Sequence, residues 1–337
     1  MRAYLIPKDC RSLDQLRLAE RRDPQPGPGQ VLIRIRAASL NYRDHMILTG
    51  DYFGMTAPRE LTPCSDLAGE VIGVGAAVTR VKVGDRVTAT FSQADPNGPA
   101  SGPQGPLGLP HDGALAEQIV LHEDGVLPIP PGYSFEEAAC LPCAGVTAWN
   151  TLMIAGRPIR PGDTVVALGT GGVSIWALQL AHAAGARVII TSSSDEKIER
   201  ARALGASDGI NYRRTPEWDQ EVMRLTGGRG ADCIIEVGGE GTLARSFRAL
   251  AQRGKVGLIG VLAGASQDLG IHTLMFKQGT LHGIMVGDRS LFEQLNQAVT
   301  ADGIKPVIDG VFAFEDARAA FERQQSGAFM GKIVVAI

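Results

Sequence analysis

The segment from Val165 to Ala181, VVALGTGGVSIWALQLA, constrains the fold more than any other part of the chain. It begins with a β-branched run, continues through a cluster of glycines and ends in an apolar stretch with helical spacing. A strand, a glycine-rich turn and a helix in this order predict a βα unit whose turn lies at the carboxyl end of the strand. Such units build parallel sheets, so the segment favours an open α/β fold.

The same alternation of strands and helices continues after this segment, as a doubly wound parallel sheet requires. Helices are expected between the strands, including one over residues 241–254, and two more helices and two more strands follow Arg289. The further strands that we predict within the sheet are residues 187–192, 207–212, 231–239, 255–262 and 279–287.

The first 120 residues have a different pattern, which is typical of a β-rich domain. In Gln30–Ser39, apolar and polar residues alternate with a period of two. Later segments are short, β-branched and bounded by glycine. Residues 92–113 contain too much proline and glycine for a helix or a paired strand, so we expect a long loop there. The chain is therefore predicted to combine a β-rich part with a parallel α/β part.

The turn after the first α/β strand has the spacing of a dinucleotide-binding motif, with Ser174 in place of the third glycine. The first glycine allows the tight turn, and the second lets the backbone approach a pyrophosphate. The amino end of the following helix supplies N–H groups and a positive dipole end for the anion. The residues that we expect to contact the coenzyme here are Gly169, Thr170, Gly171, Gly172 and Val173.

The end of the second α/β strand indicates which dinucleotide is bound. A carboxylate about 20 residues after the turn would hold the ribose 2′-hydroxyl of NADH, but the residue at this distance is Ser192. The alternative is that these residues only begin a helix that Ser194 caps, and this role is compatible with phosphate binding. Hydroxyl groups and cations suit the extra phosphate of NADPH, so the prediction is NADP. The contacts that we expect are Ser192, Ser193, Lys197 and Tyr212.

Open α/β sheets bind ligands beyond the carboxyl ends of their strands. The ends of the later predicted strands therefore complete the expected coenzyme site. They contribute Gly238, Gly260, Val261, Leu262 and Val286.

The overall composition excludes several classes of partner. The 337 residues carry a net charge of −3, which argues against binding of nucleic acid or of an acidic membrane surface. The amino terminus has no apolar signal core. The uncharged stretch Thr164–Ala186 contains glycines, Gln179 and His182, which favour a buried strand and helix over a membrane span. Five cysteines, an odd number in a long chain, indicate reduced thiols, so we expect a cytoplasmic protein.

Four stretches together resemble the medium-chain dehydrogenase/reductase superfamily, and the resemblance covers nearly the whole chain. They are SLNYRD, DLAGEVIGVGAAVTRVKVGDRV, LPCAGVTAWNTL and GTGGVS with the later ARVI. Within the superfamily, the chain resembles the zinc-free branch of quinone oxidoreductases and enoyl reductases. The resemblance implies a GroES-like catalytic domain, residues 1–145 and 289–337, and a Rossmann coenzyme domain, residues 146–288. It also implies a homodimer, a nicotinamide near Thr147, and Lys332 returning toward the coenzyme.

The residues at the zinc positions of that superfamily argue against a metal. The resemblance places Asn41, Ser65 and Cys143 where zinc-dependent members carry three ligands. Asparagine and serine are poor zinc ligands, and the region of the structural zinc lobe, residues 92–113, has no cysteine. We therefore expect neither a catalytic nor a structural zinc. The alternative is a rearranged metal site built from Cys64, Asp66, His45 and Cys143.

The expected lack of a Lewis acid bears on the substrate. A saturated alcohol or a plain aldehyde becomes harder to convert. A quinone or an α,β-unsaturated carbonyl is easier, because its conjugated oxygen spreads the accepted charge and a hydrogen-bond donor can stabilise it. The catalytic candidates are Asn41, Tyr42 and Asp44. Each has a structural alternative: Asn41 as a helix cap, Tyr42 as a pocket wall and Asp44 in a salt bridge.

The sequence thus predicts an NADPH-dependent oxidoreductase that transfers hydride to a quinone or an α,β-unsaturated carbonyl without zinc. The expected partner is a small-molecule carbonyl substrate, with no nucleic acid and no membrane. Two alternatives stay open. One is an alcohol dehydrogenase that acts on a small alcohol or aldehyde, and the other is a non-catalytic NADPH-binding sensor or interaction protein.

Overall fold

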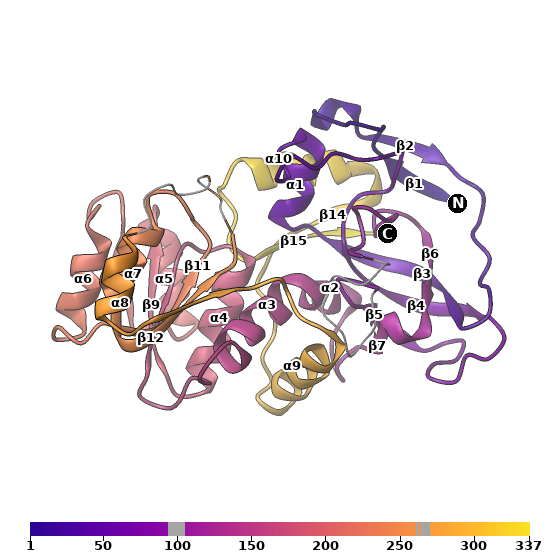
Figure 1. Cartoon of the computed structure of the whole chain (residues 1–337). Coiled ribbons are helices and arrows are strands. Elements are labelled where there is room, and N and C mark those ends of the chain that lie inside the picture. Colours follow the sequence, from indigo (N-terminus) through magenta and orange to yellow (C-terminus); the bar gives the residue numbers. More distant parts are fainter. Residues whose placement is uncertain (94–104, 261, 263, 265–269) are drawn as a thin grey trace. The chain divides into compact units, whose positions relative to one another are not determined.

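The structure, a computed structural model, describes residues 1–93, 105–260, 262, 264 and 270–337 (Figure 1). Contacts within the chain divide it into two compact units. Unit 1 comprises Met1–Val146 and Val286–Ile337, and unit 2 comprises Thr147–Met285. Each unit is built around a sheet of its own.

The described strands of unit 2 form one parallel sheet in the order β10-β9-β8-β11-β12-β13. The chain builds this sheet outward from β8 through β9 and β10, and then returns to the other side of β8 with β11. The predicted doubly wound parallel sheet is therefore confirmed. The strands are β8 (Thr164–Ala167), β9 (Arg187–Ser192), β10 (Asp208–Asn211), β11 (Ala231–Glu236), β12 (Leu250–Leu258) and β13 (Thr280–Gly283).

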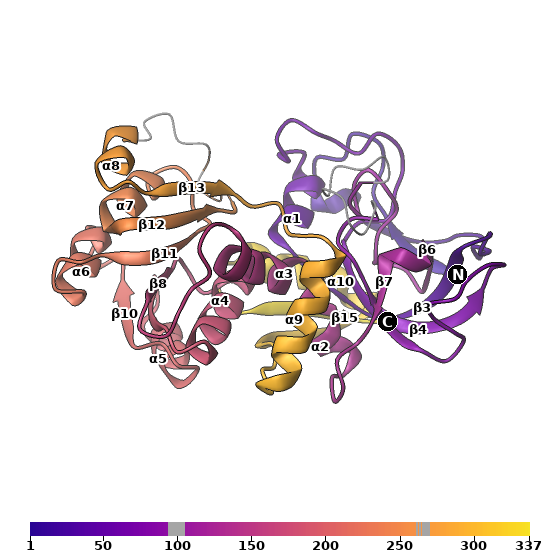
Figure 2. The same cartoon turned by 60° about the horizontal axis from the view of Figure 1, so that its bottom comes forward.

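Helices cover both faces of this sheet. α4 packs against β8 and β9, and α5 packs against β9 and β10, whereas α7 packs against β11, β12 and α6. Because parallel crossovers are right-handed, the reversal of strand order at β8 places the two groups of helices on opposite faces. Figure 2 shows α4 and α5 together, away from α7 and α8. The helices are α4 (Gly172–Ala183), α5 (Asp195–Ala203), α6 (Trp218–Leu225), α7 (Leu243–Ala249) and α8 (Ile271–Phe276).

Burial explains why Val165–Ala181 carries no charge. All four residues of β8 are buried, as expected for a central strand that is covered on both faces. α4 buries Ile175, Trp176 and Leu178 among its apolar residues. In the portion of the chain that the structure describes, no helix is long and apolar enough to cross a membrane.

One predicted helix is shorter than expected. α7 ends at Ala249, and the following LAQRG begins β12 instead of continuing the helix over residues 241–254. Leu250 pairs with Ala231, and pairing resumes at Lys255 after an irregularity that contains Arg253, whose φ is 60°. Strand pairing overrides the local helical pattern here. The short helices α2 and α8 are absent from the sequence prediction.

Strand β3 (Gln30–Ser39) is the centre of the sheet in unit 1. It pairs along most of its length with β4 (Asp66–Val74). On its other edge, its first residues pair with β6 (Gln118–His122) and its last residues pair with β15 (Lys332–Ala336). The last strand of the chain is thereby built into a sheet that the first third of the chain forms. The other strands are β1 (Arg2–Leu5), β2 (Arg17–Glu20), β5 (Arg86–Ala89), β7 (Val126–Pro128) and β14 (Ile308–Ala313).

Short helical segments join these strands. α1 (Tyr42–Thr49) begins after its N-cap residue Asn41 and ends at Gly50, whose φ of 75° suits glycine. Asn41 therefore occupies the helix-cap position that was its structural alternative. The remaining helical segments are α2 (Phe135–Ala139), α3 (Val146–Trp149), α9 (Arg289–Ala301) and α10 (Ala317–Gln325), the 3-10 turns η1 (Leu13–Gln15), η2 (Glu123–Gly125) and η5 (Phe314–Asp316), and the π turns η3 (Leu141–Gly145) and η4 (Asn150–Ile154).

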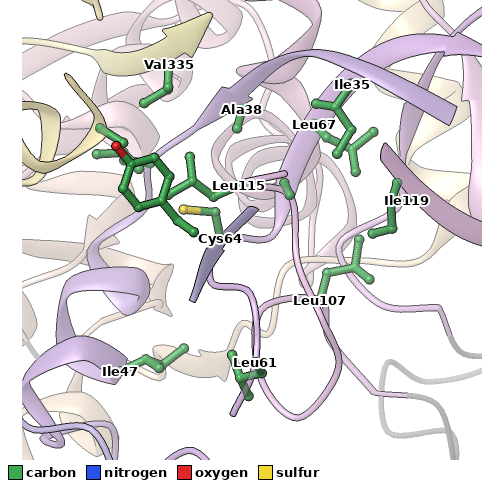
Figure 3. Packing of buried hydrophobic residues seen from close by; sticks show 14 of the residues in the cluster. Ile35, Ala38, Ile47, Leu61, Cys64, Leu67, Leu107, Leu115, Ile119 and Val335 are labelled. Atoms are coloured by element: carbon green, nitrogen blue, oxygen red, sulfur yellow. The ribbon is translucent and has the colours of Figure 1, made fainter. Parts of the chain in front are cut away.

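A large hydrophobic core fills unit 1 (Figure 3). Ile35 and Ala38 of β3 contribute to it, together with Leu67 of β4. Cys64 is fully buried in this core, near Leu115 in Figure 3. Burial raises the pKa of its thiol well above the ordinary value, so Cys64 is a packed, protonated core residue.

The predicted loop over residues 92–113 contains no helix or regular strand at the positions that the structure describes. Its described end is anchored to α1, because the Arg43 guanidinium donates to the carbonyl oxygens of Leu107 at 2.8 Å and Leu109 at 3.3 Å. Residues 94–104 of this loop lie outside the described residues.

Candidate active site and coenzyme site

The glycine turn of unit 2 follows β8 directly. Gly169 has a φ of 73°, and Gly171 is the N-cap residue of α4. A Cβ atom built at either glycine meets no other atom within 4 Å, so the space above the turn is open. Gly172 and Val173 form the first turn of α4, and Thr170 is buried between the glycines. The backbone is thus accessible to a phosphate at a helix amino end.

Two side chains hold this turn in place. The Ser174 hydroxyl donates to the carbonyl oxygen of Leu168 at 2.6 Å and is buried, so it ties the start of α4 to the end of β8. This contact explains how serine replaces the third glycine of the motif. The N–H of Gly169 donates to Thr191 Oγ1 at 3.0 Å, which joins the turn to β9.

The serines after β9 differ in exposure. Ser192 is buried, and its Oγ accepts the N–H of Ser194 at 3.2 Å. Ser194 caps α5 by accepting the N–H of Lys197 at 3.3 Å, which confirms the helix cap. Ser193 is half-buried and lies between the two. A ligand beyond β9 would therefore meet Ser193 more readily than Ser192.

The acid nearest to these serines is already engaged. Asp195 accepts a hydrogen bond from Asn211 Nδ2 at 2.8 Å and two from the Arg214 guanidinium, at 2.5 and 2.7 Å. The exposed Tyr212 follows β10 and donates its N–H to the carbonyl of Ser192 at 3.0 Å, so the ends of β9 and β10 lie side by side. Hydroxyl, aromatic and cationic groups thus surround the end of β9, with its carboxylate neutralised.

The end of β11 contains a feature that the sequence analysis did not identify. Glu236 is fully buried, and its carboxylate accepts the N–H groups of Gly238 at 2.8 Å and Gly239 at 3.1 Å, the hydroxyl of Thr242 at 2.7 Å and the hydroxyl of Ser246. It therefore organises the loop that carries Gly238. The signal in the sequence is an acid at the end of an apolar strand, followed by two glycines and two hydroxyl residues.

The other predicted coenzyme residues lie as follows. Gly260 and the exposed Leu262 come after β12, whereas Val261 is outside the described residues. Val286 is buried, with a φ of 49°, just beyond unit 2. Thr147, the first residue of unit 2, is buried, and its carbonyl accepts the Thr151 hydroxyl at 2.8 Å.

Unit 1 contains a group of buried polar residues that we call the polar cluster: Asn41, Ser65, Asp66, Cys143 and Lys332. Lys332, which the resemblance leads us to expect near the coenzyme, is buried, and its Nζ donates to Asn41 Oδ1 at 2.6 Å. Asn41 Nδ2 lies 3.4 Å from Ser65 Oγ, which donates to Asp66 Oδ1 at 2.8 Å. The second carboxylate oxygen of Asp66 accepts the N–H of Cys143 at 3.2 Å and lies 3.9 Å from Lys332 Nζ.

Burial and charge set the protonation of this cluster. Burial raises the pKa of Asp66, and the opposing effects of Lys332 and of the Asn41, Ser65 and Cys143 hydrogen bonds limit the rise. Burial also raises the pKa of the Cys143 thiol, and the charge of Asp66 adds to this effect. The thiol is therefore protonated at neutral pH.

The two other catalytic candidates, Asp44 and Tyr42, differ in their burial and in their contacts. Asp44 is fully buried, accepts the N–H of Asn41 at 2.8 Å and lies 3.6 Å from the Arg43 guanidinium. Burial raises its pKa to about 6 although Arg43 opposes the shift. Tyr42 is 44% exposed, with its ring 5.9 Å from that of His45. Asp44 thus supports the start of α1, whereas Tyr42 is free to meet a ligand.

The polar cluster does not fit a zinc ion. The oxygen of Asn41 faces an ammonium group, and the Ser65 hydroxyl is used by Asp66, so Asp66 and Cys143 are the zinc-type ligands that remain, fewer than the three that a catalytic site needs. In the described parts of the chain, no three His, Cys, Asp or Glu side chains are grouped as a metal site requires. Of the rearranged set Cys64, Asp66, His45 and Cys143, Asp66 and Cys143 are neighbours, but no three of the four are grouped as a metal site requires.

Two family models match the chain, each over a different part. The model of the zinc-binding dehydrogenases matches residues 172–301. The model of the alcohol dehydrogenase GroES-like domain matches residues 27–131.

Relatives match over nearly the whole chain. A zinc-type alcohol dehydrogenase-like protein of Schizosaccharomyces pombe is 40% identical, over 99% of this chain and 99% of that protein. The crystal structure of an NAD-dependent alcohol dehydrogenase is 31% identical, with a TM-score of 0.92 and 100% of both chains covered. That of a quinone oxidoreductase from Pseudomonas syringae pv. Tomato is 27% identical, with a TM-score of 0.83 over 100% of this chain and 99% of the other.

Proposed function

The chain belongs to the medium-chain dehydrogenase/reductase superfamily and is an NAD(P)H-dependent oxidoreductase, and we propose that it transfers hydride from NADPH to a quinone or an α,β-unsaturated carbonyl without zinc. The predicted family and the predicted fold, a GroES-like domain with a Rossmann domain, are confirmed. The substrate, the choice of NADPH and the lack of zinc are the proposal.

One observation carries the chemical part of the proposal: the polar cluster presents a hydrogen-bond donor where zinc-dependent relatives would need a ligand. The NH₂ group of Asn41 lies 3.4 Å from Ser65 Oγ and also donates toward the carboxylate of Asp66, so this end of the carboxamide is held as a hydrogen-bond donor. It can donate to a substrate oxygen on which negative charge develops. Such a donor is sufficient for a conjugated oxygen, which spreads the charge, more readily than for a saturated alkoxide.

NADPH would be held by the glycine turn and by the residues at the ends of β9 and β10. When bound, it supplies the hydride. The N–H groups at the start of α4 would receive the pyrophosphate. Ser193, Lys197 and Tyr212 would surround the 2′-phosphate, and the pairing of Asp195 with Arg214 would reduce the repulsion between that carboxylate and the phosphate.

A homodimer is part of the proposal because β13, at one end of the sheet of unit 2, has no partner strand on its outer edge among the described residues. β13 is the last strand in the sheet order. Apolar side chains are exposed on and beside it, and such a patch with an unpaired edge favours a partner strand. A second copy of the chain is the occupant that we propose, and sedimentation of the purified protein tests it. The exposed residues are Ile271, Met275, Phe276, Leu281 and Met285.

The proposed activity is tested by following NADPH oxidation with 1,4-benzoquinone and 2-cyclohexenone, with NADH as the matched coenzyme. We expect turnover with NADPH and weaker turnover with NADH. Ser193→Asp places a carboxylate beside the 2′-phosphate, so NADPH affinity should fall about tenfold or more while NADH affinity is retained. Equal use of both coenzymes by the wild type would overturn the NADPH assignment.

An alcohol dehydrogenase is the second candidate, because the relatives from S. pombe and the NAD-dependent solved structure carry that description. Oxidation of small primary and secondary alcohols with NAD⁺ tests it. Faster alcohol oxidation than quinone or enone reduction would favour this candidate.

A further inference from the structure

The polar cluster contains a buried cation that the proposed function does not yet use. Lys332 Nζ donates to the carbonyl oxygen of Leu40 at 2.7 Å and to Asn41 Oδ1 at 2.6 Å, and Asp66 Oδ2 lies 3.9 Å away. Lys332 is 3% exposed and Asp66 is fully buried. The two charges are therefore held together away from water, where each compensates the other.

This arrangement determines which way the Asn41 carboxamide points. An ammonium group can only donate, so the carboxamide oxygen must face Lys332. The NH₂ end is then turned toward Ser65, which accepts from it and donates in turn to Asp66. The positive ammonium of Lys332 thus holds the oxygen end of the Asn41 carboxamide. The negative carboxylate of Asp66 acts on the nitrogen end through Ser65.

We propose that Lys332 is a positioning residue that locks Asn41 with its NH₂ group as the donor to the substrate oxygen. The inference rests on the proposed function, in which Asn41 stabilises that oxygen. Without the ammonium, the carboxamide loses the partner of its oxygen, and Asp66 loses its counter-charge. The amide can then turn and present its own oxygen, which would repel the developing negative charge of the substrate.

The test compares Lys332→Met, Asn41→Ala and the double variant with the wild type, using NADPH and 2-cyclohexenone. We expect each single substitution to lower kcat about a hundredfold, with the Kd for NADPH unchanged because Lys332 Nζ is engaged by Leu40, Asn41 and Asp66. The double variant should be no slower than Asn41→Ala alone, since Lys332 acts through Asn41. Lys332→Arg, which also only donates, should restore most of kcat.

A second buried lysine supplies the matched control. Lys255 of unit 2 is 5% exposed and donates to the carbonyl oxygens of Leu152 at 3.0 Å and Ala155 at 2.8 Å. Lys255→Met removes a comparable buried ammonium, so loss of stability alone should affect both lysine variants. It should not show the coupling to Asn41 that Lys332→Met shows.

A readout without turnover separates this inference from the proposed function. The side-chain amide signals of Asn41 in a ¹⁵N-correlated NMR spectrum, assigned by their loss in Asn41→Ala, should move in Lys332→Met and stay in Lys255→Met. A wild type that reduces no quinone or enone would refute the proposed function, while these signals would still test the positioning. If Lys332→Met does not fold, Lys332→Met/Asp66→Asn is compared with Asp66→Asn.

Unmoved Asn41 signals, a Lys332→Met variant with wild-type kcat, or losses that multiply in the double variant would each overturn the role of Lys332. Moved signals together with equal kcat in Asn41→Ala and the double variant would support it.

Discussion

Two fully buried carboxylates, Asp66 in unit 1 and Glu236 in unit 2, show how the same chemical group serves different ends. Among the described residues, the donors to Glu236 are neutral: two backbone N–H groups and two hydroxyls. Asp66 accepts from the Ser65 hydroxyl, the Cys143 N–H and the Asn41 carboxamide, and it faces the ammonium of Lys332. Neutral donors fix a backbone loop, whereas a facing cation creates a polar cluster whose side chains can act on a substrate.

The two carboxylates therefore differ in role: Glu236 holds a loop, whereas Asp66 belongs to the cluster that we propose acts on the substrate. The donors of Glu236 belong to the loop and helix that directly follow it in the chain. The partner of Asp66, Lys332, is far away in sequence and reaches it only when β15 pairs with β3. A carboxylate whose hydrogen-bond donors lie in the loop directly after it, as in Glu236, holds that loop in place. A carboxylate whose partner comes from a distant strand, as in Asp66, ties the catalytic candidate Asn41 to the sheet.

The largest expected effect concerns Glu236. Glu236→Ala leaves four donors without their acceptor, so we expect the free energy of unfolding to fall by about 4 kcal/mol. Urea unfolding measures it, with Glu199→Ala as control, because Glu199 is an exposed acid in a surface ion pair and its loss should cost less than about 0.5 kcal/mol. Equal effects of the two substitutions would contradict the structural role of Glu236.

The coenzyme turn gives the next largest effect. Gly171→Val adds a side chain in open space, so the fold should be retained to within about 1 kcal/mol. The same side chain blocks the approach of a pyrophosphate, so the Kd for NADPH should rise about a hundredfold, or about 2.7 kcal/mol. Fluorescence titration with NADPH measures the change. Unaltered affinity would place the coenzyme elsewhere.

The smallest effect is a pH dependence in unit 1. The folded pKa of Asp44, about 6, lies above its usual value near 3.8, because burial penalises the charged form. Folding therefore favours the protonated acid, and the contribution of Asp44 to stability falls as pH rises from about 4 to about 6. Asp44→Asn should remove this slope, about 2 kcal/mol across the interval. Urea unfolding of both proteins at pH 4, 5 and 6 measures it, and parallel curves would contradict the shift.

Local patterns were sufficient for much of the fold and of the coenzyme turn. The β-branched runs predicted the strands of unit 2, and the glycine cluster predicted the turn before α4, because periodicity and turn chemistry act within a few residues. The same reasoning extended the helix at residues 241–254 too far, since the pairing of Leu250 with Ala231 is a tertiary effect.

The polar cluster could be predicted only in part. The sequence pointed to Asn41 and Ser65, and the family resemblance pointed to Lys332 near the coenzyme, but neither indicated that Lys332 contacts Asn41. The contact between Lys332 and Asn41 spans 291 positions and depends on β15 joining β3. No local pattern encodes such a contact, and the same holds for the pairing of Asp66 with Lys332.

The central claim is that Asn41 and its cluster, and not zinc, stabilise the substrate oxygen during hydride transfer from NADPH. The most direct test is the zinc content of purified protein, measured by mass spectrometry on the same preparation that is assayed with NADPH and 2-cyclohexenone, before and after treatment with a chelator. We expect far less than one zinc per subunit and an unchanged rate after chelation. One zinc per subunit, with a rate lost to the chelator and restored by Zn²⁺, would contradict it.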